Sequence, residues 1–310
     1  MQRHPPHENL SADARGAAIA LGNFDGVHRG HQAVIASARA AADRLGAPLG
    51  VAVFDPHPRR LFQPDAPPFR LQTPDQRARA LAGLGVSHLY KIGFDRALSQ
   101  RSDREFAEQI LAGELGVRHV SIGADFRFGR GRMGDALSLR RLGKELGFGV
   151  SAVEPIGGGE SKYSSSAIRA ALLAGDVAEA AAALGRPWAI EGVVQRGFAR
   201  GRAFGFATAN VPLGEYVRPR LGIYAVRVTI GDARFGGVAS IGVNPSVGAL
   251  PEPLLETHIF NFDADLYGQR IEVELIAFLR EEKHFEDLEL LKREMAEDSA
   301  KARAVLASVV

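Results

Sequence analysis

Two histidines, His28 and His31, stand where an apolar run over residues 17–21 passes through a glycine-rich turn into a helical pattern. Residues 22–31 read Gly-Asn-Phe-Asp-Gly-Val-His-Arg-Gly-His. A strand, a tight turn and a helix N-terminus make an anion site, because backbone N–H groups point outward there and the helix dipole favours negative charge. Side chains three positions apart on a helix share one face, so both imidazoles can donate to one phosphate. The pattern indicates a nucleotide phosphate that is handled without a covalent enzyme intermediate.

Two other interpretations of the histidine pair stay open on these residues alone. The pair is also typical of a helix end, where one histidine caps the other. Zinc is a third interpretation, but a zinc site needs at least three protein ligands and the chain has no cysteine. Gly22, Gly26 and Gly30 favour phosphate, because glycine lets the backbone approach a ligand closely. Asp25 lies on the same turn, where it would contact a ribose, a metal or a histidine.

Three further motifs of the first half also have two interpretations each. Residues 54–58 read Phe-Asp-Pro-His-Pro, and their prolines fix an extended turn that is either a ligand wall or a stiff surface loop. Asp125 and Phe126 follow a later apolar run, and the phenylalanine either stacks on a ligand ring or packs. The Tyr-Ser-Ser-Ser run at 163–166 opens a helix that carries Arg169, and it is either an N-cap or a second phosphate cradle.

In the second half, Thr208 and Asn210 lie two apart on an expected strand and therefore point the same way. They could share one Mg²⁺ ion or phosphate, or mark a glycine-rich barrel corner. Glu256 alternates with apolar residues, so it is either a carboxylate inside a barrel mouth, acting as a general base, or part of a solvated strand face. The P-loop pattern Gly-x-x-x-x-Gly-Lys-Ser/Thr is absent from the sequence, so any kinase activity would fall outside that class.

Apolar runs that alternate with helical patterns position the first group of motifs. This alternation predicts a parallel α/β sheet with helices on both faces, whose ligands bind at the carboxyl ends of the strands. The predicted strands are 17–21, 48–54, 88–92, 117–123 and 150–153, and the predicted helices are 32–45, 75–84, 103–115, 137–146 and a pair over 164–184 that breaks at 175–176.

The pattern changes after residue 185, where short β-type runs follow one another without intervening helices. Such a series predicts a closed antiparallel barrel. We expect a loose polar tail over residues 1–16, a first domain over 17–185 and a second over 186–310. The predicted strands of the second domain are 189–194, 223–230, 233–241, 256–262 and 270–279, followed by a terminal helix over 286–308.

Length, composition and net charge limit the classes of protein to which the chain can belong. A chain of 310 residues is more than one core usually organises, and 46% hydrophobic with 24% charged residues is ordinary for a globular enzyme. The net charge of +2 predicts no nucleic-acid partner. The sequence has no cysteine and no apolar run of about 18 residues, so we expect a cytoplasmic protein without a membrane partner. Homo-oligomer formation stays open.

Taken together, the motifs resemble the prokaryotic bifunctional riboflavin kinase/FMN adenylyltransferase (FAD synthetase) family. The resemblance runs from about residue 18 to residue 306 with the motifs in family order, and that joint order is highly specific. It rests on the segments at 22–31, 54–58, 123–129, 164–169, 208–210, 256–258, 265–268 and 279–285.

The resemblance implies a Rossmann-like nucleotidylyltransferase domain with a parallel sheet, then an antiparallel β-barrel riboflavin kinase domain with a terminal helix. The barrel would phosphorylate riboflavin with ATP to FMN, and the first domain would transfer AMP from ATP to FMN, giving FAD and pyrophosphate. Mg²⁺ would be the cofactor, with ATP and the flavins as substrates. A flavin carrier that has lost the chemistry is the non-enzymatic alternative.

The resemblance also implies roles for single residues. In adenylyl transfer, His28, His31 and Arg169 would be catalytic. In the kinase, Glu256 would activate the ribityl hydroxyl. ATP would be bound by Gly22, Asn23, Asp25, His28, His31, Ser164, Ser165, Arg169, Thr208 and Asn210, with Thr208 and Asn210 also holding the metal; flavins would be bound by Phe54, Pro56, His57, Asp125, Phe126 and Arg280.

Two departures from the family pattern affect these expectations. Ala207 stands where the family usually has a proline, which could loosen the turn before Thr208. Ser166 and Ala167 stand where the family often has threonine and arginine. The missing arginine removes one positive charge, so adenylyl transfer is the activity that this departure would weaken.

Overall fold

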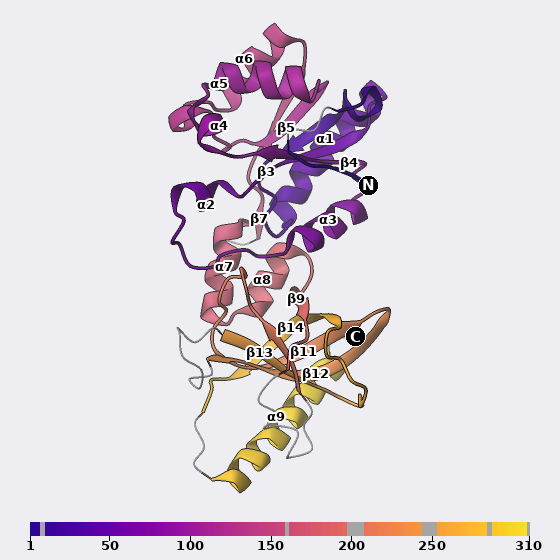
Figure 1. Ribbon diagram of the computed structural model, residues 1–310, viewed down its shortest axis with the longest axis vertical. Coiled ribbons are helices and arrows are strands. Elements are labelled where there is room, and N and C mark those ends of the chain that lie inside the picture. The colour runs from indigo at the N-terminus through magenta and orange to yellow at the C-terminus, as the bar shows by residue number, and fades with distance from the viewer. Residues whose placement is uncertain (7–9, 159–160, 197–207, 244–252, 284–286, 309–310) are drawn as a thin grey trace. The chain divides into compact units, whose positions relative to one another are not determined.

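The computed structural model describes residues 1–6, 10–158, 161–196, 208–243, 253–283 and 287–308, and it forms two compact units (Figure 1). The first unit holds Met1–Ala66 and Pro74–Ser164, and the second holds Pro67–Thr73 and Ser165–Val310. The sequence places the boundary at 185/186. Packing instead groups the helix pair after Ser164, and the short segment before Pro74, with the second unit.

The first unit is built on a six-stranded parallel sheet in the order β1-β4-β3-β2-β5-β6. All four side chains of β2 (Ala18–Leu21) are at most 2% exposed, as expected for a parallel strand that is covered on both faces. The predicted parallel sheet is confirmed. Its other strands are β1 (Gln2–His4), β3 (Leu49–Asp55), β4 (His88–Gly93), β5 (His119–Gly123) and β6 (Gly149–Val153).

Helices cover both faces of this sheet (Figure 1). One face packs against α1 (Arg29–Leu45) and α3 (Pro74–Gly83). The other packs against the π-helix η2 (Phe106–Glu114) and α6 (Ala136–Leu146). The remaining short elements are η1 (Ala12–Ala14), α2 (Pro58–Phe62), α4 (Arg96–Gln100), α5 (Asp103–Glu105), η3 (Arg130–Arg132) and the hairpin of β7 (Gly157–Gly158) with β8 (Ser161–Lys162).

The strand order puts the switch of chain direction at β2. The chain runs outward from β2 to β3 and β4 on one side, and then returns to place β5 and β6 on the other. In open α/β sheets, ligands bind outside the carboxyl ends of the strands at such a switch point. The segment that follows β2 is the one with the two histidines.

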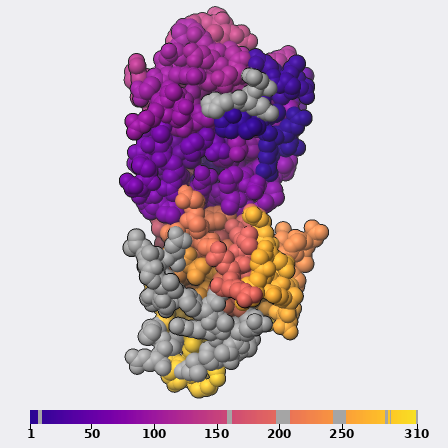
Figure 2. Space-filling model, in the orientation of Figure 1, coloured from indigo at the N-terminus to yellow at the C-terminus, as the bar shows by residue number. Residues whose placement is uncertain are grey.

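The predicted loose tail is wrong over Gln2–His4. These residues form β1, which pairs in parallel with β4 and puts His4 opposite Tyr90. His4 Nε2 lies 3.0 Å from His88 Nδ1, and both imidazoles are at least nine-tenths buried. In the space-filling view, indigo atoms of the N-terminal part of the chain lie at the surface of the first unit beside purple atoms of later segments (Figure 2). A three-residue polar strand carries no periodicity, so only its tertiary partners reveal it.

The second unit contains a six-stranded antiparallel sheet in the order β10-β13-β12-β11-β14-β9. Gln195 and Asn210 form an antiparallel bridge that links the two edges, and Gln195 N–H donates to Asn210 O at 2.8 Å. The predicted antiparallel barrel fold is therefore confirmed. The strands are β9 (Trp188–Val193), β10 (Thr208–Pro212), β11 (Gly222–Ile230), β12 (Ala233–Val243), β13 (Pro253–Ile259) and β14 (Arg270–Arg280).

Three helices accompany this sheet. The predicted pair after residue 164 is observed as α7 (Ser165–Ala174) and α8 (Val177–Leu184). The terminal helix α9 (Leu288–Ser308), yellow in Figure 1, packs Ala302 against Ala225 on the sheet. The predicted terminal helix is confirmed with a later start.

Candidate functional sites

His28 is the N-cap residue of α1. Its Nδ1 accepts a hydrogen bond from the backbone N–H of His31 at 3.3 Å, and the two imidazole rings stack with centroids 3.6 Å apart. His28 is only 6% exposed. The histidines therefore do form a capping pair, as one interpretation expected. This cap does not exclude phosphate binding. Capping uses Nδ1, so a phosphate contact of His28 would have to come from Nε2.

The turn before this cap has an unusual backbone. Phe24 and Val27 have φ values of 51° and 45°, and Gly26 between them has 91°. Positive φ at non-glycine residues costs about 1–3 kcal/mol each and is found mainly at functional sites. Local hydrogen bonds hold the turn: Val27 N–H donates to Phe24 O at 3.3 Å, and Gln32 Nε2 donates to Val27 O at 3.0 Å.

A buried arginine from another helix also supports this turn. Arg77 on α3 is 6% exposed, and its Nη1 donates to the backbone carbonyl of Asn23 at 3.2 Å. Oδ1 of Asn23 is buried and accepts no hydrogen bond from the residues that the structure describes. Such an atom suits a ligand donor. The sequence interpretation missed Arg77, because only the fold brings α3 under the loop.

Gly30 brings two distant motifs together within the first unit. A Cβ at this position would lie 3.1 Å from ring atoms of His28 and 3.1 Å from the carbonyl oxygen of Tyr163. The absence of a side chain therefore lets the chain just before Ser164 lie against the histidine turn. Ser164 belongs to this unit, and Ser165 begins α7 of the second.

Arg169 belongs to the second unit. It is half-buried, its Nε donates to the backbone carbonyl of Phe69 at 2.6 Å, and its guanidinium lies 5.6 Å from the centroid of the Phe69 ring. These contacts fix the plane of the guanidinium group.

The motif at 54–58 lies at the carboxyl end of β3. His57 caps α2 through its Nδ1, Pro56 is exposed, and the Asp55 carboxylate pairs with Lys91 at 3.0 Å. Phe54 is 9% exposed and contacts Phe94 edge to face at 5.5 Å. The motif thus combines a core aromatic ring with an exposed turn.

Asp125 and Phe126 follow β5, the neighbour of β2 on the other side. Asp125 is exposed, and Phe126 is half-buried against the core with its ring stacked on Phe128 at 6.0 Å. Packing is therefore part of the role of Phe126.

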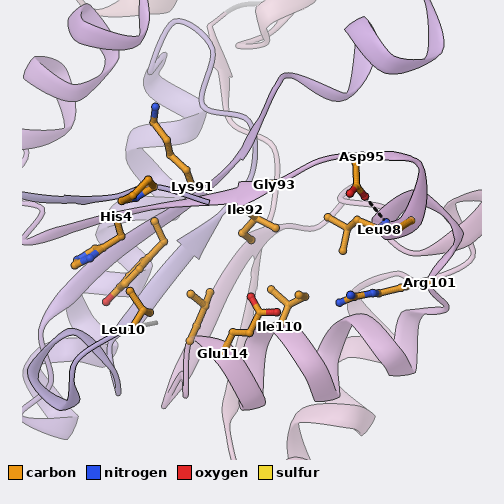
Figure 3. Close-up of a pocket in the computed structure, with 14 residues that line it drawn as sticks. His4, Leu10, Lys91, Ile92, Gly93, Asp95, Leu98, Arg101, Ile110 and Glu114 are labelled. Carbon is orange, nitrogen blue, oxygen red and sulfur yellow. Dashed lines mark hydrogen bonds between the residues drawn. The ribbon is translucent and has the colours of Figure 1, made fainter. Parts of the chain in front are cut away.

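A cavity of about 70 Å³ lies elsewhere in the first unit, between β4 and η2 (Figure 3). Arg101 and Glu114 point into it from opposite sides, among apolar residues such as Ile92 and Ile110. It contains none of the residues that the sequence predicts for catalysis or binding. We therefore assign the site from the strand ends and the helix N-terminus.

In the second unit, strand register brings the predicted kinase residues into one row. Asn210 pairs with Glu256, Glu256 with Ser240, Ser240 with Ile223, and Ile223 with Arg280. Directly paired residues project from the same face of a sheet. The row therefore puts one residue from each of five strands side by side, with a register shift in the ladder next to the Ile223–Arg280 pair. Ser240 was missed, because register is not readable from a single strand.

Thr208 belongs to the same face, two residues before Asn210, and pairs with His258. The alternating residues Ala209 and Thr257 point the other way and are at most 6% exposed. They belong to the barrel interior. Of the two interpretations of Glu256, this register favours the strand face, since half-buried Glu256 projects with Asn210 and not with Ala209 and Thr257.

Arg280 ends the row and is held by the terminal helix. Its Nε and Nη2 donate to the two oxygens of Asp298 at 2.9 and 2.6 Å, and Glu294 lies 3.8 Å from its Nε. Asp298 is 3% exposed. A flavin contact of Arg280 would thus come from a guanidinium that α9 already orients.

In the described part of the chain, no helix is long and apolar enough to cross a membrane. Among the same residues, no cluster of three or more His, Asp or Glu side chains could hold a metal ion.

The two sites define a class of protein. A helix N-terminus with two histidines at the switch point of a parallel sheet suits nucleotide phosphates. A row of hydroxyl, amide and carboxylate groups on a barrel suits phosphoryl transfer to an alcohol. The chain thus has the features of a nucleotide-dependent transferase with two sites.

Comparison with known proteins agrees with this class. The family model described as FAD synthetase matches residues 10–167, and the model described as riboflavin kinase matches residues 184–306. A protein from Pseudomonas fluorescens named bifunctional riboflavin kinase/FMN adenylyltransferase is 42% identical over 299 residues, 96% of each chain. The Bacillus subtilis protein of that name is 35% identical over 303 residues, 96% of this chain and 95% of the relative.

A solved structure from Streptococcus pneumoniae, titled as a macrolide-efflux protein, has the same fold. The TM-score is 0.88 at 29% identity, covering 97% of this chain and 98% of that one. The chain described here belongs to the bifunctional riboflavin kinase/FMN adenylyltransferase family.

Proposed function

We propose that the chain carries out two successive reactions at two separate sites. The barrel unit phosphorylates riboflavin with ATP, giving FMN and ADP. The α/β unit then transfers AMP from a second ATP to FMN, giving FAD and pyrophosphate. The observation that carries this proposal is the match of the two family models to the two halves of one chain.

For adenylyl transfer we assign the phosphate contacts to the N-terminus of α1 and the start of α7. An FMN phosphate oxygen attacks the α-phosphorus of ATP, and the bond to the pyrophosphate oxygen breaks. Negative charge grows on the leaving group, where His28, His31 and Arg169 stabilise it. Backbone N–H groups at the helix N-terminus add to this stabilisation. Gly22, Asn23, Asp25, Ser164 and Ser165 complete the ATP contacts.

We place the flavin of this reaction at the carboxyl ends of β3 and β5, the two neighbours of β2. Phe54 and Pro56 form one part of the wall, with His57 beside them. Asp125 and Phe126 form the other. The packing of Phe54 and Phe126 in the core keeps this wall rigid, which favours transfer between two bound substrates.

For the kinase we assign Glu256 as the general base. Its carboxylate accepts the proton of the terminal ribityl hydroxyl, whose oxygen attacks the γ-phosphorus of ATP while the bond to ADP breaks. Arg280 at the end of the row contacts the flavin. Because catalysis of this kind depends on positioning, the rigid cross-strand row supports it.

Thr208 and Asn210 suit a magnesium–nucleotide complex. They offer a hydroxyl and an amide oxygen on one face, and Mg²⁺ prefers hard oxygen donors completed by phosphates and water. When bound, Mg²⁺ would neutralise charge on the phosphates. The protein residues would hold the complex beside Glu256. A cytoplasmic location stays a prediction.

One experiment tests the pair of activities. Purified protein is incubated with riboflavin, ATP and Mg²⁺, and the flavins are separated by chromatography; we expect FMN first and FAD later. FMN supplied in place of riboflavin tests the second reaction alone. Tight flavin binding without either product would show a carrier and overturn the proposal.

A further inference from the structure

A short segment, Pro67–Thr73, precedes α3 in sequence but packs with the second unit, and we name it the strap. The strap forms a parallel bridge between Arg70 and Tyr216. Arg70 N–H donates to Glu215 O at 2.9 Å, and Val217 N–H donates to Arg70 O at 2.8 Å. The backbone of the strap is thus fixed at Arg70 by two hydrogen bonds to the segment 215–217.

Side chains around the barrel hold the strap further. Trp188, at the start of β9, donates its Nε1–H to Leu71 O at 2.7 Å, and both residues are at most 2% exposed. Arg186 Nη2 donates to Gln72 Oε1 at 3.3 Å. No water replaces a hydrogen bond buried this deeply, so removing the Trp188 donor weakens the attachment of the strap at Leu71.

Tyr216 ties the same contacts together. Its hydroxyl group accepts a hydrogen bond from the backbone N–H of Glu191 in β9 at 2.9 Å, and its ring meets Trp188 edge to face at 5.8 Å. Burial raises the pKa of this phenol far above its ordinary value, so the group stays protonated. The strap therefore has one fixed arrangement against β9.

The other end of the strap sets the orientation of Arg169. Phe69 is 2% exposed, its carbonyl oxygen accepts the 2.6 Å hydrogen bond from Arg169 Nε, and its ring lies under the guanidinium. Phe69 lies only two residues from Leu71, the residue that Trp188 holds. We therefore expect a shift of the strap at Leu71 to reorient the Arg169 side chain.

We propose that Trp188 and the strap position Arg169 for adenylyl transfer. The inference rests on the proposed role of Arg169 in that reaction. Trp188 contacts no group that we assign to the reaction. It acts only through its hydrogen bond to the Leu71 carbonyl and, from there, through the contact of Phe69 with Arg169. A residue of the barrel strand thus controls the efficiency of FAD formation, while riboflavin phosphorylation does not depend on it.

The test uses the full chain with Trp188→Phe, which keeps the packing of an aromatic ring and removes the donor to Leu71. We expect kcat for FAD formation from FMN to fall about threefold to tenfold, with KM for FMN unchanged. Riboflavin phosphorylation, measured on the same sample, should stay within about twofold and shows that the barrel is folded. The matched control is Tyr224→Phe, which removes another buried donor to a backbone carbonyl, that of Arg220, away from the strap. It should leave FAD formation unchanged.

A double-mutant cycle with Arg169→Lys identifies the path. If Trp188 acts through Arg169, adding Trp188→Phe to Arg169→Lys lowers FAD formation no further. An undiminished effect in that background, or a parallel loss of both activities in Trp188→Phe alone, would overturn the strap inference. If Arg169→Lys by itself leaves FAD formation unchanged, the proposed function of Arg169 fails instead. If FAD formation falls with Arg169→Lys but not with Trp188→Phe, only the strap inference is rejected, and the proposed function of Arg169 stands.

Discussion

The histidine turn of the α/β unit and the residue row of the barrel unit, the two sites that we propose for phosphate groups, are built in different ways. The turn is a contiguous segment, residues 22–31, whose strained backbone and helix N-terminus present N–H groups. The row takes single side chains from five strands, which only the antiparallel register brings together. The first site is thus local in sequence and built largely from backbone, and the second is non-local and built from side chains.

This difference determines how each site fails. A site made of backbone donors loses only part of its strength when one side chain is removed, because helix N–H groups and the dipole remain. A site with one general base loses most of its rate with that base. The two units should therefore respond unequally to single substitutions.

The largest effect is expected from Glu256→Gln. The amide keeps the size of the side chain but cannot accept the ribityl proton, so FMN formation should fall about 10²- to 10⁴-fold. Conversion of supplied FMN to FAD should not change. Rates of both reactions, measured by flavin chromatography, check this. Equal loss of both activities would contradict separate sites.

A smaller effect is expected from His28→Ala, about 10²-fold on FAD formation with FMN formation intact. This substitution also removes the cap of α1, which costs about 1 kcal/mol. His28→Asn separates the two contributions, because asparagine is a good N-cap and has no imidazole. If His28→Asn restores FAD formation, capping and not phosphate contact explains the loss.

The two sites also differ in how far the sequence alone could predict them. The switch-point turn was predicted from glycine spacing and a helix start, although α1 begins at Arg29, three residues early, because His28 serves as its cap. The barrel row could not be derived, since pairing of Asn210 with Glu256 depends on register between segments far apart. The edge strand Gln2–His4 and the support from Arg77 were missed for the same reason. Only tertiary contacts make them visible.

Gly30→Ala tests the close approach at the histidine turn. The new Cβ would lie 3.1 Å from the His28 ring and the Tyr163 carbonyl, so these groups must move by a few tenths of an ångström. We expect FAD formation to fall about fivefold, equivalent to ~1 kcal/mol. Gly83→Ala is the matched control, because a Cβ there meets nothing within 4 Å. A comparable loss in the control would show a general effect of helix substitution.

The smallest effect on activity is expected from Asp298→Asn, which weakens the bidentate ion pair between Asp298 on α9 and Arg280. An ion pair becomes a hydrogen bond from the Arg280 cation to a neutral amide oxygen, so the free energy of unfolding should fall by about 1–2 kcal/mol, measured by denaturant titration. KM for riboflavin should rise only about twofold, because Arg280 keeps its charge and its place at the end of the row. Arg280→Lys is the companion variant, since it loses the same two-oxygen contact and also the guanidinium that we assign to the flavin. If both variants raise KM equally, Arg280 serves only to dock α9, and the kinase row ends at Ile223. A larger rise with Arg280→Lys shows that the side-chain row extends across all five strands to the flavin.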